Sequence, residues 1–429
     1  MMNYAEALEY IHSVCWKGSR PGLERTQQLL GMMGDPQDSL RFVHVAGTNG
    51  KGSFCCMLSS ILKEAGYKVG TYTSPFVRYF NERMAINGQM IGNGELAEIT
   101  EYVKQFAEKM DDVPTEFELI TAIGFEYFKR NKCDIVVLET GMGGRLDSTN
   151  IIENPILSVI TGISLDHTGF WGNTLSEIAA ERAGIIKKGC PVVYGGNSGE
   201  ALEVIKNKAQ EMESDFYFAT RDDFTDIEFS LRGCTLSSRE YQNLFVSLVG
   251  EYQPSNIATV LKAVSVLNDR GIKITEQAVR LGMSKAYWPA RFEIINEKPL
   301  MIYDGAHNPE GLRACIDSVK RFFGEQKVNI LSGVMADKDV SEMLPVIKEV
   351  ANKAFTVTPD NPRSMKSSVY AEHFNKYGIE AHSFDTIEEG VRGAITASEK
   401  DGCPCIALGT LYMYGDVRTA LENIYGKEN

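Results

Sequence analysis

Apolar runs of strand length alternate with amphipathic segments along most of this chain, and this alternation limits the possible folds more than any other feature. LRFVHVAG at 40–47 is the first clear apolar run, and helical periodicity follows it over 52–65. Gly66 then stands where a helix stop is expected. Repeated strand and helix signals in this order predict an α/β architecture. Between 214 and 249 the pattern changes to short alternating runs, which predict an added small β region.

The length of 429 residues exceeds what one ordinary core accommodates, so the chain is predicted to form two domains. A second series of apolar runs opens with PLMIYDG at 299–305, shortly after the segment WPARFE at 288–293. Clear helical patterns in this second series cover 311–323 and 341–352. We therefore expect one domain over 1–290 and a second over 291–429.

The formal net charge of -13, without a basic stripe, disfavours nucleic acids and anionic membrane surfaces as partners. The amino-terminal segment lacks the basic flank and apolar run of a signal peptide, and no stretch approaches the length of a membrane span. The nine cysteines show no CxxC spacing that indicates a zinc or redox site. These features predict a cytoplasmic, monomeric protein that acts on small molecules.

A glycine-rich segment, VAGTNGKGS at 45–53, lies between a predicted strand and a predicted helix. Its glycines let the backbone approach an anion, and the following helix amino terminus favours negative charge. Lys51 is placed to reach outer phosphates, and Ser53 to contact a phosphate or a magnesium ion. The strict P-loop pattern is not met, because Val45 replaces its first glycine and Gly52 separates the lysine from the serine. A plain glycine turn is the alternative, but the combination favours a nucleotide site.

Polar residues follow two later strands, at the edge where open α/β sheets bind ligands. Glu139 ends CDIVVLE, and His167 follows ILSVITG. Glu139 suits magnesium, which prefers oxygen ligands, whereas His167 fits a hydrogen-bonding role equally well. The alternatives are a cap or surface acid for Glu139, an ordinary loop histidine for His167, and an internal ion pair between Arg145 and Asp147.

A polar turn also follows a strand in the second domain, in YDGAHNP at 303–309. Asp304 is placed to accept a ribose hydroxyl, and His307 to contact a carboxylate or a phosphate. Asn308 before Pro309 is equally consistent with a helix N-cap. Arg291 in WPARFE is a candidate phosphate ligand, with an interdomain salt bridge as the alternative.

An ordered set of motifs resembles the Mur ligase superfamily, and most closely its folylpolyglutamate synthase and dihydrofolate synthase branch. The resemblance covers nearly the whole chain. The motifs are GTNGKGS at 47–53, TSP at 73–75 with Glu82 and Arg83, TEFE at 115–118, ETGMGGRLDSTN at 139–150, LDHTGFWG at 165–172, GEYQPSNIATV at 250–260, WPARFE at 288–293, DGAHNP at 304–309 and GTLYMYGDVR at 409–418.

This resemblance implies a P-loop NTPase-like first domain and a Rossmann-like C-terminal glutamate-ligase domain. It implies an ATP- and Mg²⁺-dependent ligase of folate biosynthesis and one-carbon metabolism, which adds L-glutamate to the γ-carboxylate of tetrahydrofolate through an acyl phosphate. Whether dihydropteroate is also a substrate stays open. The implied nucleotide-binding residues are Asn49, Gly50, Lys51, Gly52, Ser53, Asn256, Arg291 and Asp304. The implied magnesium ligands are Ser74, Glu139 and His167. The implied substrate-binding residues are Thr115, Glu116, Phe117, Glu118, Leu146, Asp147, Ser148, Arg182 and Thr410. The implied catalytic residues are Lys51, Glu139, His167 and His307.

The chain departs from this family at three positions. Arg182 stands where members commonly carry a lysine that is carbamylated to bind a second magnesium ion, and a guanidinium cannot form that carbamate. Arg182 is instead a candidate ligand for a phosphate or a substrate carboxylate. Phe76 replaces a frequent histidine and Ala290 a usual glycine. The rival functions are a Mur-type ligase acting on a cell-wall nucleotide precursor and a nucleotide-binding regulator without catalysis.

Overall fold

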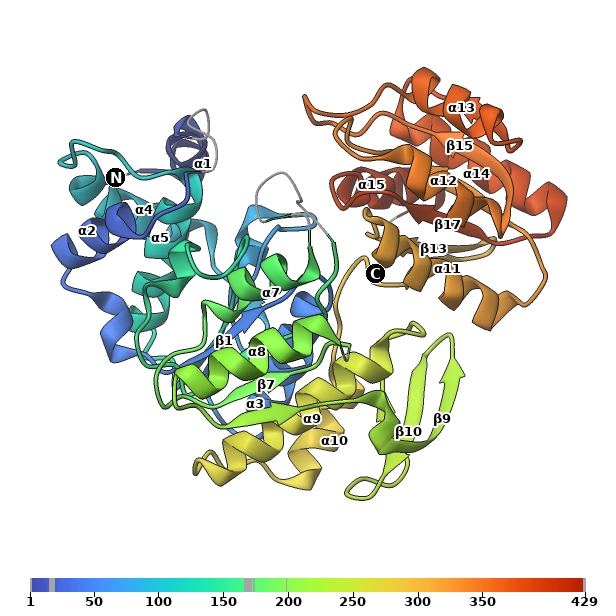
Figure 1. Ribbon diagram of the computed structural model, residues 1–429. Helices are drawn as coiled ribbons and strands as arrows, with labels where there is room; N and C mark the ends of the chain where they lie inside the picture. The colour runs from blue at the N-terminus through green and yellow to red at the C-terminus, as the bar shows by residue number, and fades with distance from the viewer. Residues whose placement is uncertain (1, 15–19, 166–171, 173, 198, 427–429) are drawn as a thin grey trace. The chain divides into compact units, whose positions relative to one another are not determined.

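The computed structural model describes residues 2–14, 20–165, 172, 174–197 and 199–426. The chain divides into two compact units, each built around its own α/β sheet (Figure 1). The first unit consists of Met1–Thr225, Ser237–Val246 and Pro254–Tyr287. The second consists of Asp226–Leu236, Ser247–Gln253 and Trp288–Asn429.

An eight-stranded sheet forms the centre of the first unit, with the strand order β4-β3-β2-β5-β1-β6-β7-β8. All strands from β2 to β8 in that order run parallel, and β3 and β4 extend the edge in antiparallel pairs. The strands are β1 (Phe42–Ala46), β2 (Val69–Tyr72), β3 (Met84–Ile86), β4 (Gln89–Met90), β5 (Ile135–Glu139), β6 (Leu157–Ile160), β7 (Val192–Tyr194) and β8 (Phe216–Phe218). Because β5 and β6 both pair with β1, the carboxyl ends of these three strands meet at one edge.

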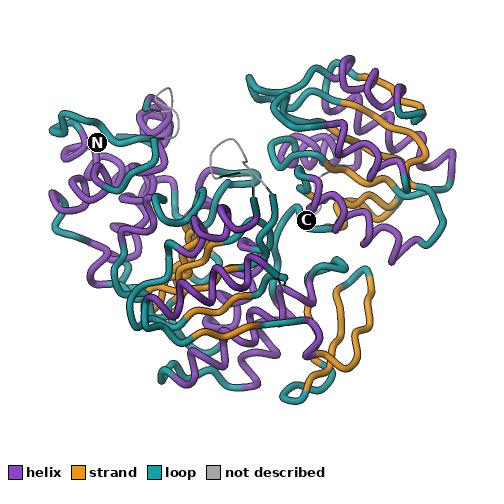
Figure 2. Tube along the Cα trace, viewed as in Figure 1, coloured by secondary structure: helices purple, strands orange, loops and turns teal. Residues whose placement is uncertain are grey.

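Helices cover both faces of this sheet (Figure 2). They are α1 (Tyr4–Ser13), α2 (Glu24–Met32), α3 (Lys51–Glu64), α4 (Asn93–Ala107), α5 (Glu116–Arg130), α7 (Leu175–Ala183), α8 (Glu200–Glu211), α9 (Gln253–Asp269) and α10 (Glu276–Lys285). Short 3₁₀ turns lie at η2 (Pro36–Ser39), η3 (Phe80–Arg83), η4 (Ser148–Ile151) and η5 (Arg221–Asp223).

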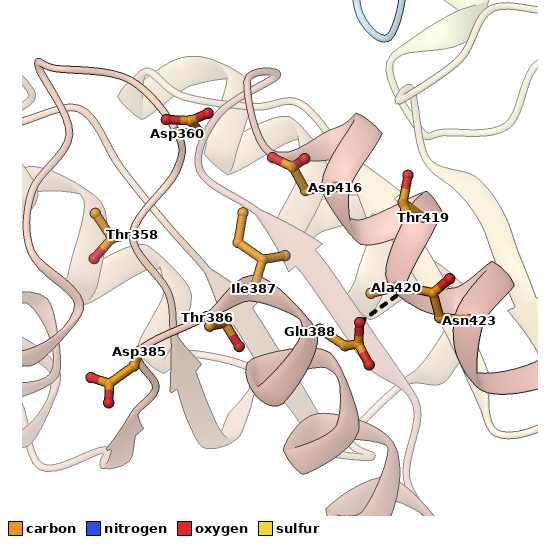
Figure 3. Close-up of a pocket in the computed structure, with 10 residues that line it drawn as sticks. All are labelled: Thr358, Asp360, Asp385, Thr386, Ile387, Glu388, Asp416, Thr419, Ala420 and Asn423. Carbon is orange, nitrogen blue, oxygen red and sulfur yellow. Dashed lines mark hydrogen bonds between the residues drawn. The ribbon is translucent and has the colours of Figure 1, made fainter.

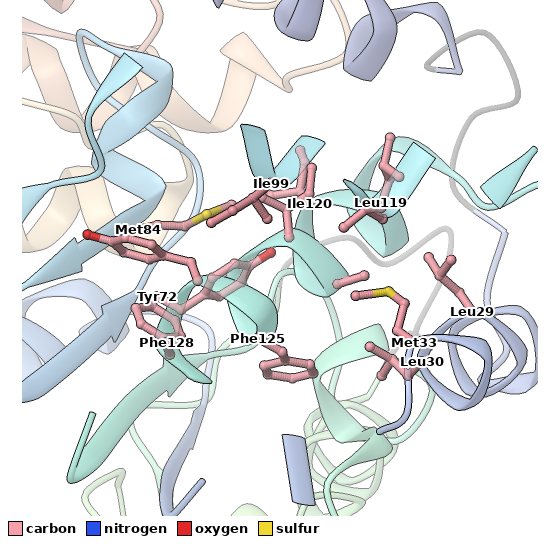
Figure 4. Close-up of a cluster of buried hydrophobic side chains, with 14 of the residues drawn as sticks. Leu29, Leu30, Met33, Tyr72, Met84, Ile99, Leu119, Ile120, Phe125 and Phe128 are labelled. Carbon is pink, nitrogen blue, oxygen red and sulfur yellow. The ribbon is translucent and has the colours of Figure 1, made fainter. Parts of the chain in front are cut away.

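The main core of the first unit lies between β1, β2 and β5 and the helices α1, α2, α4 and α5. Figure 4 shows Leu29 and Leu30 of α2, Ile99 of α4, Phe125 of α5 and Tyr72 of β2 in this cluster. Helix α5 is buried on most of its surface, because FELITAIGFEYF is apolar nearly all round. A second cluster joins α7 and α8 to β6 and β7.

A three-stranded sheet of order β11-β10-β9 occupies the region predicted as an added small β region. Its strands are β9 (Phe224–Ser230), β10 (Gly233–Ser238) and β11 (Leu244–Val246). The prediction of short strands between 214 and 249 is therefore confirmed.

The second unit has a six-stranded sheet of order β12-β13-β17-β14-β15-β16, in which only the β12–β13 pair is antiparallel. The strands are β12 (Glu293–Glu297), β13 (Leu300–Asp304), β14 (Val328–Ser332), β15 (Ala351–Thr356), β16 (Glu380–Ser383) and β17 (Cys405–Leu408). The helices are α11 (Pro309–Phe323), α12 (Val340–Lys348), α13 (Ser367–Lys376), α14 (Ile387–Asp401) and α15 (Tyr414–Tyr425). Its core packs α11, α12 and α13 against this sheet.

The predicted α/β fold class is confirmed, and one predicted element is wrong in its extent. The helical pattern over 341–352 ends earlier than expected, because α12 stops at Lys348 and β15 begins at Ala351. Glu349, Ala351 and Asn352 do not break a helix, whereas the β-branched Val350 favours a strand slightly. Parallel pairing of β15 with β14, which places Phe355 beside Leu331, overrides that local preference.

Candidate active site

The glycine-rich segment forms the turn between β1 and α3, as the sequence predicts. Gly50 caps α3 at φ +90°, and a Cβ there would lie 2.4 Å from Asn256 Oδ1. Gly47 is equally constrained, because its Cβ would lie 2.0 Å from Thr161 Oγ1. Only glycine satisfies both the backbone conformation and the close approach at these positions. The turn therefore has the geometry of a backbone cradle for an anion at a helix amino terminus.

Lys51 opens α3, and its side chain folds back over this turn. Its Nζ donates to the carbonyl oxygens of Gly47, at 2.9 Å, and Thr48, at 3.1 Å. The ammonium group therefore lies against the backbone of the loop. Asn49 is partly exposed and contacts Ser164 Oγ at 3.4 Å, whereas Ser53 is buried within the first turn of α3.

Glu139 lies at the end of β5, next to this turn, because the β1–β5 register pairs it with Val45. It is only 4% exposed, and its Oε2 accepts a hydrogen bond from the Ser74 N–H at 3.2 Å. The structure thus brings together two of the predicted magnesium ligands, Ser74 and Glu139. His167 lies outside the described residues. Among those that are described, no group of three or more His, Cys, Asp or Glu side chains is gathered closely enough to hold a metal ion.

The loop over 141–147 lies after β5 and is held by its own polar groups. Asp147 is 6% exposed, and its carboxylate accepts from Met142 N at 2.8 Å, Thr149 N at 3.0 Å and Thr149 Oγ1 at 2.6 Å. Burial raises the pKa of Asp147, and these hydrogen bonds oppose that effect. The alternative of an ion pair between Arg145 and Asp147 is wrong, since Arg145 Nη2 contacts Glu181 Oε1 at 2.7 Å.

Arg182 lies in the last turn of α7 and is 3% exposed. Its Nη1 donates to the carbonyl oxygen of Gly143, so the guanidinium packs against the 141–147 loop. Arg145 N also donates to Glu181 O, at 2.9 Å, and this bond ties the same loop to α7. The guanidinium of Arg182, which stands in place of the expected lysine, is therefore hydrogen-bonded to the backbone of this loop.

The predicted substrate segment 115–118 forms the start of α5. Thr115 and Glu118 make a reciprocal capping box, in which Thr115 N donates to Glu118 Oε2 at 2.7 Å. The Glu118 carboxylate also accepts hydrogen bonds from Arg25 Nε at 3.0 Å and Arg25 Nη2 at 2.8 Å. Glu116 contacts His12 Nδ1 at 3.2 Å. The polar groups of this segment thus stabilise the start of α5. The ring of Phe117 lies near Tyr72 and packs against the main core of the first unit.

In the second unit, Asp304 ends β13 and is 4% exposed. Its carboxylate accepts from Phe292 N at 3.0 Å, Tyr252 Oη at 3.0 Å and Ala306 N at 2.9 Å. Burial raises the pKa of Asp304, and the charge of Arg291 opposes that rise. These bonds join the segment that carries Arg291 to the turn that follows β13.

Three further predicted residues lie on the loops of this unit. His307 Nδ1 is 3.1 Å from Gly305 O, and Thr410 is buried with its Oγ1 accepting from Tyr412 N at 3.2 Å. Asn308 caps α11 and accepts from Gly311 N at 2.7 Å, as its position before a proline predicts.

The second unit contains a cavity of about 300 Å³ near the carboxyl ends of β15 and β16 (Figure 3). Acidic and threonine side chains line most of it, and Glu388 accepts a hydrogen bond from Asn423 at 3.1 Å. Burial and the nearby Asp360 raise the pKa of Asp416 at its rim. None of the residues predicted from the sequence lines this cavity.

The comparison with known proteins agrees with this geometry. Residues 45–264 match the Mur ligase middle domain, and residues 290–407 match the Mur ligase glutamate ligase domain. The chain is 36% identical to the dihydrofolate synthase/folylpolyglutamate synthase of Bacillus subtilis, over 98% of this chain and 99% of that protein. The chain belongs to the Mur ligase family, in its folylpolyglutamate synthase and dihydrofolate synthase branch.

Two further comparisons place this Mur ligase in the same branch. It is 35% identical to the folylpolyglutamate synthase of Lacticaseibacillus casei, over 98% of this chain and 99% of that protein. The folylpolyglutamate synthase of Mycobacterium tuberculosis, solved in complex with ADP and AMPPCP, superposes with a TM-score of 0.88 at 26% identity, covering 99% and 100% of the two chains. The predicted family, fold class and enzyme class, an ATP-dependent acid–amino-acid ligase, are thus confirmed. No helix in the described part of the chain has the length and apolar character needed to cross a membrane.

Sequence reasoning missed several residues that hold the predicted site residues of each unit in place. His44, Thr149 and Arg25 hold the loops around it, and Tyr252 holds Asp304. His44 was visible as a polar residue inside an apolar run, which is a usable signal. The partners of Arg25 and Tyr252 are far along the chain, so no local pattern indicates them.

Proposed function

We propose that this Mur ligase joins L-glutamate to the γ-carboxylate of tetrahydrofolate, using ATP and forming an acyl phosphate. The observation that carries the proposal is the Lys51 ammonium group held over the glycine turn, which follows β1 where the neighbouring strand β5 ends at the buried Glu139. The two relatives named for folylpolyglutamate synthesis, and the nucleotides bound to the Mycobacterium tuberculosis protein, support it.

The first step would transfer the γ-phosphoryl group of ATP to the folate carboxylate and release ADP. The backbone N–H groups of residues 49–53 and the amino terminus of α3 would bind the phosphates, with Asn256 bracing Gly50. Lys51 would exchange its carbonyl partners for phosphate oxygens and spread the transferred charge. The glutamate amine then attacks the acyl carbon, and the tetrahedral intermediate releases phosphate to leave an amide. Catalysis of this kind depends on positioning and electrostatics.

Magnesium fits the donors present near the loop. The Glu139 carboxylate and the Ser74 hydroxyl are oxygen ligands, which Mg²⁺ prefers, and we propose that they hold it together with His167. When bound, the ion would neutralise charge on the phosphate oxygens. Arg182 supplies a permanent positive charge where the family's carbamylated lysine would stand, so we propose that one magnesium ion suffices.

The remaining assignments follow the domain division at 1–290 and 291–429, with ATP binding by the first domain and glutamate ligation by the second. We propose that Arg291 contacts a phosphate and that His307 and Thr410 receive the incoming glutamate. A carboxylate offers about four acceptor sites. Three donors already occupy Asp304, which leaves capacity for the predicted ribose contact.

Dihydropteroate is the second substrate that we propose. Its carboxylate would be activated and joined to glutamate by the same two steps. The double name of the Bacillus subtilis relative supports this. Phe117 and the segment Leu146, Asp147 and Ser148 would line the pterin side of that site.

The test is glutamate-dependent ADP release by the purified chain with Mg²⁺ and ATP, comparing tetrahydrofolate with dihydropteroate. Lys51→Ala should lower the turnover by about 10²–10³, because it removes a charge contact to the transferred group. Lys63→Ala changes an exposed lysine at the other end of the same helix and should retain full turnover. Turnover with a cell-wall nucleotide precursor in place of both folates would favour the rival ligase, and no turnover with any acceptor would refute the proposal.

A further inference from the structure

His44 is a polar residue in the middle of β1, the strand at the centre of the first unit's sheet. Its side chain is completely buried, and its neighbours Val43 and Val45 belong to the apolar core. An imidazole in such a place costs free energy unless it is hydrogen-bonded. The proposed mechanism gives His44 no role.

The one contact that explains His44 leads to the 141–147 loop. Its Nε2 lies 2.9 Å from Thr149 Oγ1, and Thr149 Oγ1 lies 2.6 Å from Asp147 Oδ1. Asp147 accepts N–H bonds from Met142 and Thr149, so both of its oxygens act as acceptors. The Thr149 hydroxyl therefore donates to Asp147 and accepts from His44 Nε2–H. His44 Nδ1 has no hydrogen-bond partner among the described residues, as expected for the nitrogen without a proton.

A parallel chain of hydroxyl groups reaches the next residue of the same segment. Tyr72 Oη lies 3.1 Å from Thr121 Oγ1, and Thr121 Oγ1 lies 3.1 Å from Ser148 Oγ. Thr121 itself donates to Phe117 O at 2.8 Å, so it accepts from the other two hydroxyl groups. Residues 147–149 are thus held by buried polar groups of β1 and α5, and Tyr72 of β2 supports the contact from α5.

We infer that His44 is a positioning residue, which acts through Thr149 to fix the Asp147 carboxylate and, with it, the shape of the loop that receives the pterin substrate. The inference rests on the proposed function for the identity of that substrate. It assigns Asp147 an internal role as the acceptor that closes the loop, since its carboxylate binds the amides at both ends of residues 142–149. Arg182 holds the middle of the same loop through Gly143.

Paired substitutions test each link. Thr149→Val keeps the shape of the side chain and removes its hydroxyl group, whereas Thr149→Ser retains the hydroxyl group. His44→Leu removes the donor, and His44→Gln places an amide N–H near the position of Nε2. Thr26→Val is the matched control, because Thr26 is also fully buried in the first unit and its hydroxyl has no hydrogen-bond partner in the described structure.

Steady-state kinetics and hydrogen–deuterium exchange of the full chain give two separate results. Thr149→Val and His44→Leu should both raise the KM for tetrahydrofolate about tenfold or more. Thr149→Val removes the hydrogen bond to the Asp147 carboxylate, and His44→Leu removes the donor that orients the Thr149 hydroxyl. The KM for ATP should stay within about twofold, and exchange of the Met142 amide should accelerate. Thr149→Ser, His44→Gln and Thr26→Val should resemble the parent chain in both measurements.

Thr149→Val tests the inference even if His44→Leu fails to fold. Unchanged Met142 exchange in Thr149→Val would overturn the relay, and faster exchange with an unchanged folate KM would overturn its role in substrate positioning. Equal losses in the Thr26→Val control would also overturn it, because they would indicate general destabilisation. Absence of turnover with every folate in the parent chain refutes the proposed function instead, and the exchange result still decides whether the relay exists.

Discussion

Single buried residues affect the electrostatics of each unit, and His44 links the stability of the fold to pH. Burial lowers the pKa of His44 to about 3, and the positive charge of Lys187 adds to the effect. In the unfolded chain a histidine has a pKa of about 6.5. Between these two values the unfolded state therefore binds one more proton than the folded state. The contribution of neutral His44 to the free energy of unfolding is therefore fully present above pH 6.5. It falls as the pH drops toward the pKa of His44 in the folded state.

His44→Gln should remove this part of the pH dependence, because glutamine does not titrate. For the parent chain, lowering the pH from about 7.5 to about 5.5 should cost about 1.4 kcal/mol through His44 alone. Urea unfolding at the two pH values measures the free energies of unfolding. Between the two pH values, the free energy of unfolding of the variant should fall by about 1.4 kcal/mol less than that of the parent. An equal loss in His44→Gln would show that His44 is protonated in the folded protein.

At the scale of elements, the sequence predicted those features that depend on neighbours along the chain. The turn before α3, the N-cap of α11 and the strand that ends at Glu139 each follow from a local pattern, and each is present. The bidentate pair of Arg25 with Glu118 joins residues 93 positions apart, and the contact of His44 with Thr149 spans 105 positions. Such contacts depend on strand register and helix packing, so local periodicity does not reveal them. The predicted extent of the helix over 341–352 was wrong for the same reason, since sheet pairing decided it.

Helix α3 offers a matched pair of glycines, one at each end. Gly50 and Gly66 have φ values of +90° and +91°, but a Cβ at Gly66 meets nothing within 4 Å, whereas at Gly50 it meets Asn256 Oδ1 at 2.4 Å. Gly66→Ala should therefore lower the free energy of unfolding by only about 1–2 kcal/mol, which is the cost of the left-handed backbone conformation for alanine. Gly50→Ala should lower the free energy of unfolding by more than this. It should also fail to bind nucleotide, because the turn must move to make room for the added Cβ.

Thermal unfolding and titration with AMPPCP measure the two effects. The expected order of stability is parent, then Gly66→Ala, then Gly50→Ala, with nucleotide affinity retained by Gly66→Ala. Normal nucleotide binding by Gly50→Ala would contradict the assignment of this turn to the phosphates.

At the scale of the whole molecule, the sequence predicted two α/β parts, and the structure contains two units with separate, mostly parallel sheets. The second unit begins at Trp288, close to the WPARFE segment that suggested the boundary. It also includes Asp226–Leu236 and Ser247–Gln253, which precede it in the chain. Linear patterns cannot assign these segments, because Tyr252 and Glu251 join the second unit through contacts with residues far along the chain, among them Asp304 and Arg321.

Nucleotide binding to the folded chain should be visible as a change in its thermal stability. A ligand at a concentration 100 times its Kd stabilises the folded state by about 2.7 kcal/mol. For a unit of this size, that corresponds to a rise in Tm of about 5–10 °C. Differential scanning calorimetry with Mg²⁺ and AMPPCP should therefore show such a rise for the parent chain and a much smaller one for Lys51→Ala at the same concentration. Removal of Mg²⁺ with EDTA should reduce the rise in the parent, because Glu139 would then face the phosphates without a cation between them. An equal rise in the parent and in Lys51→Ala would mean that the nucleotide binds elsewhere than at the glycine turn.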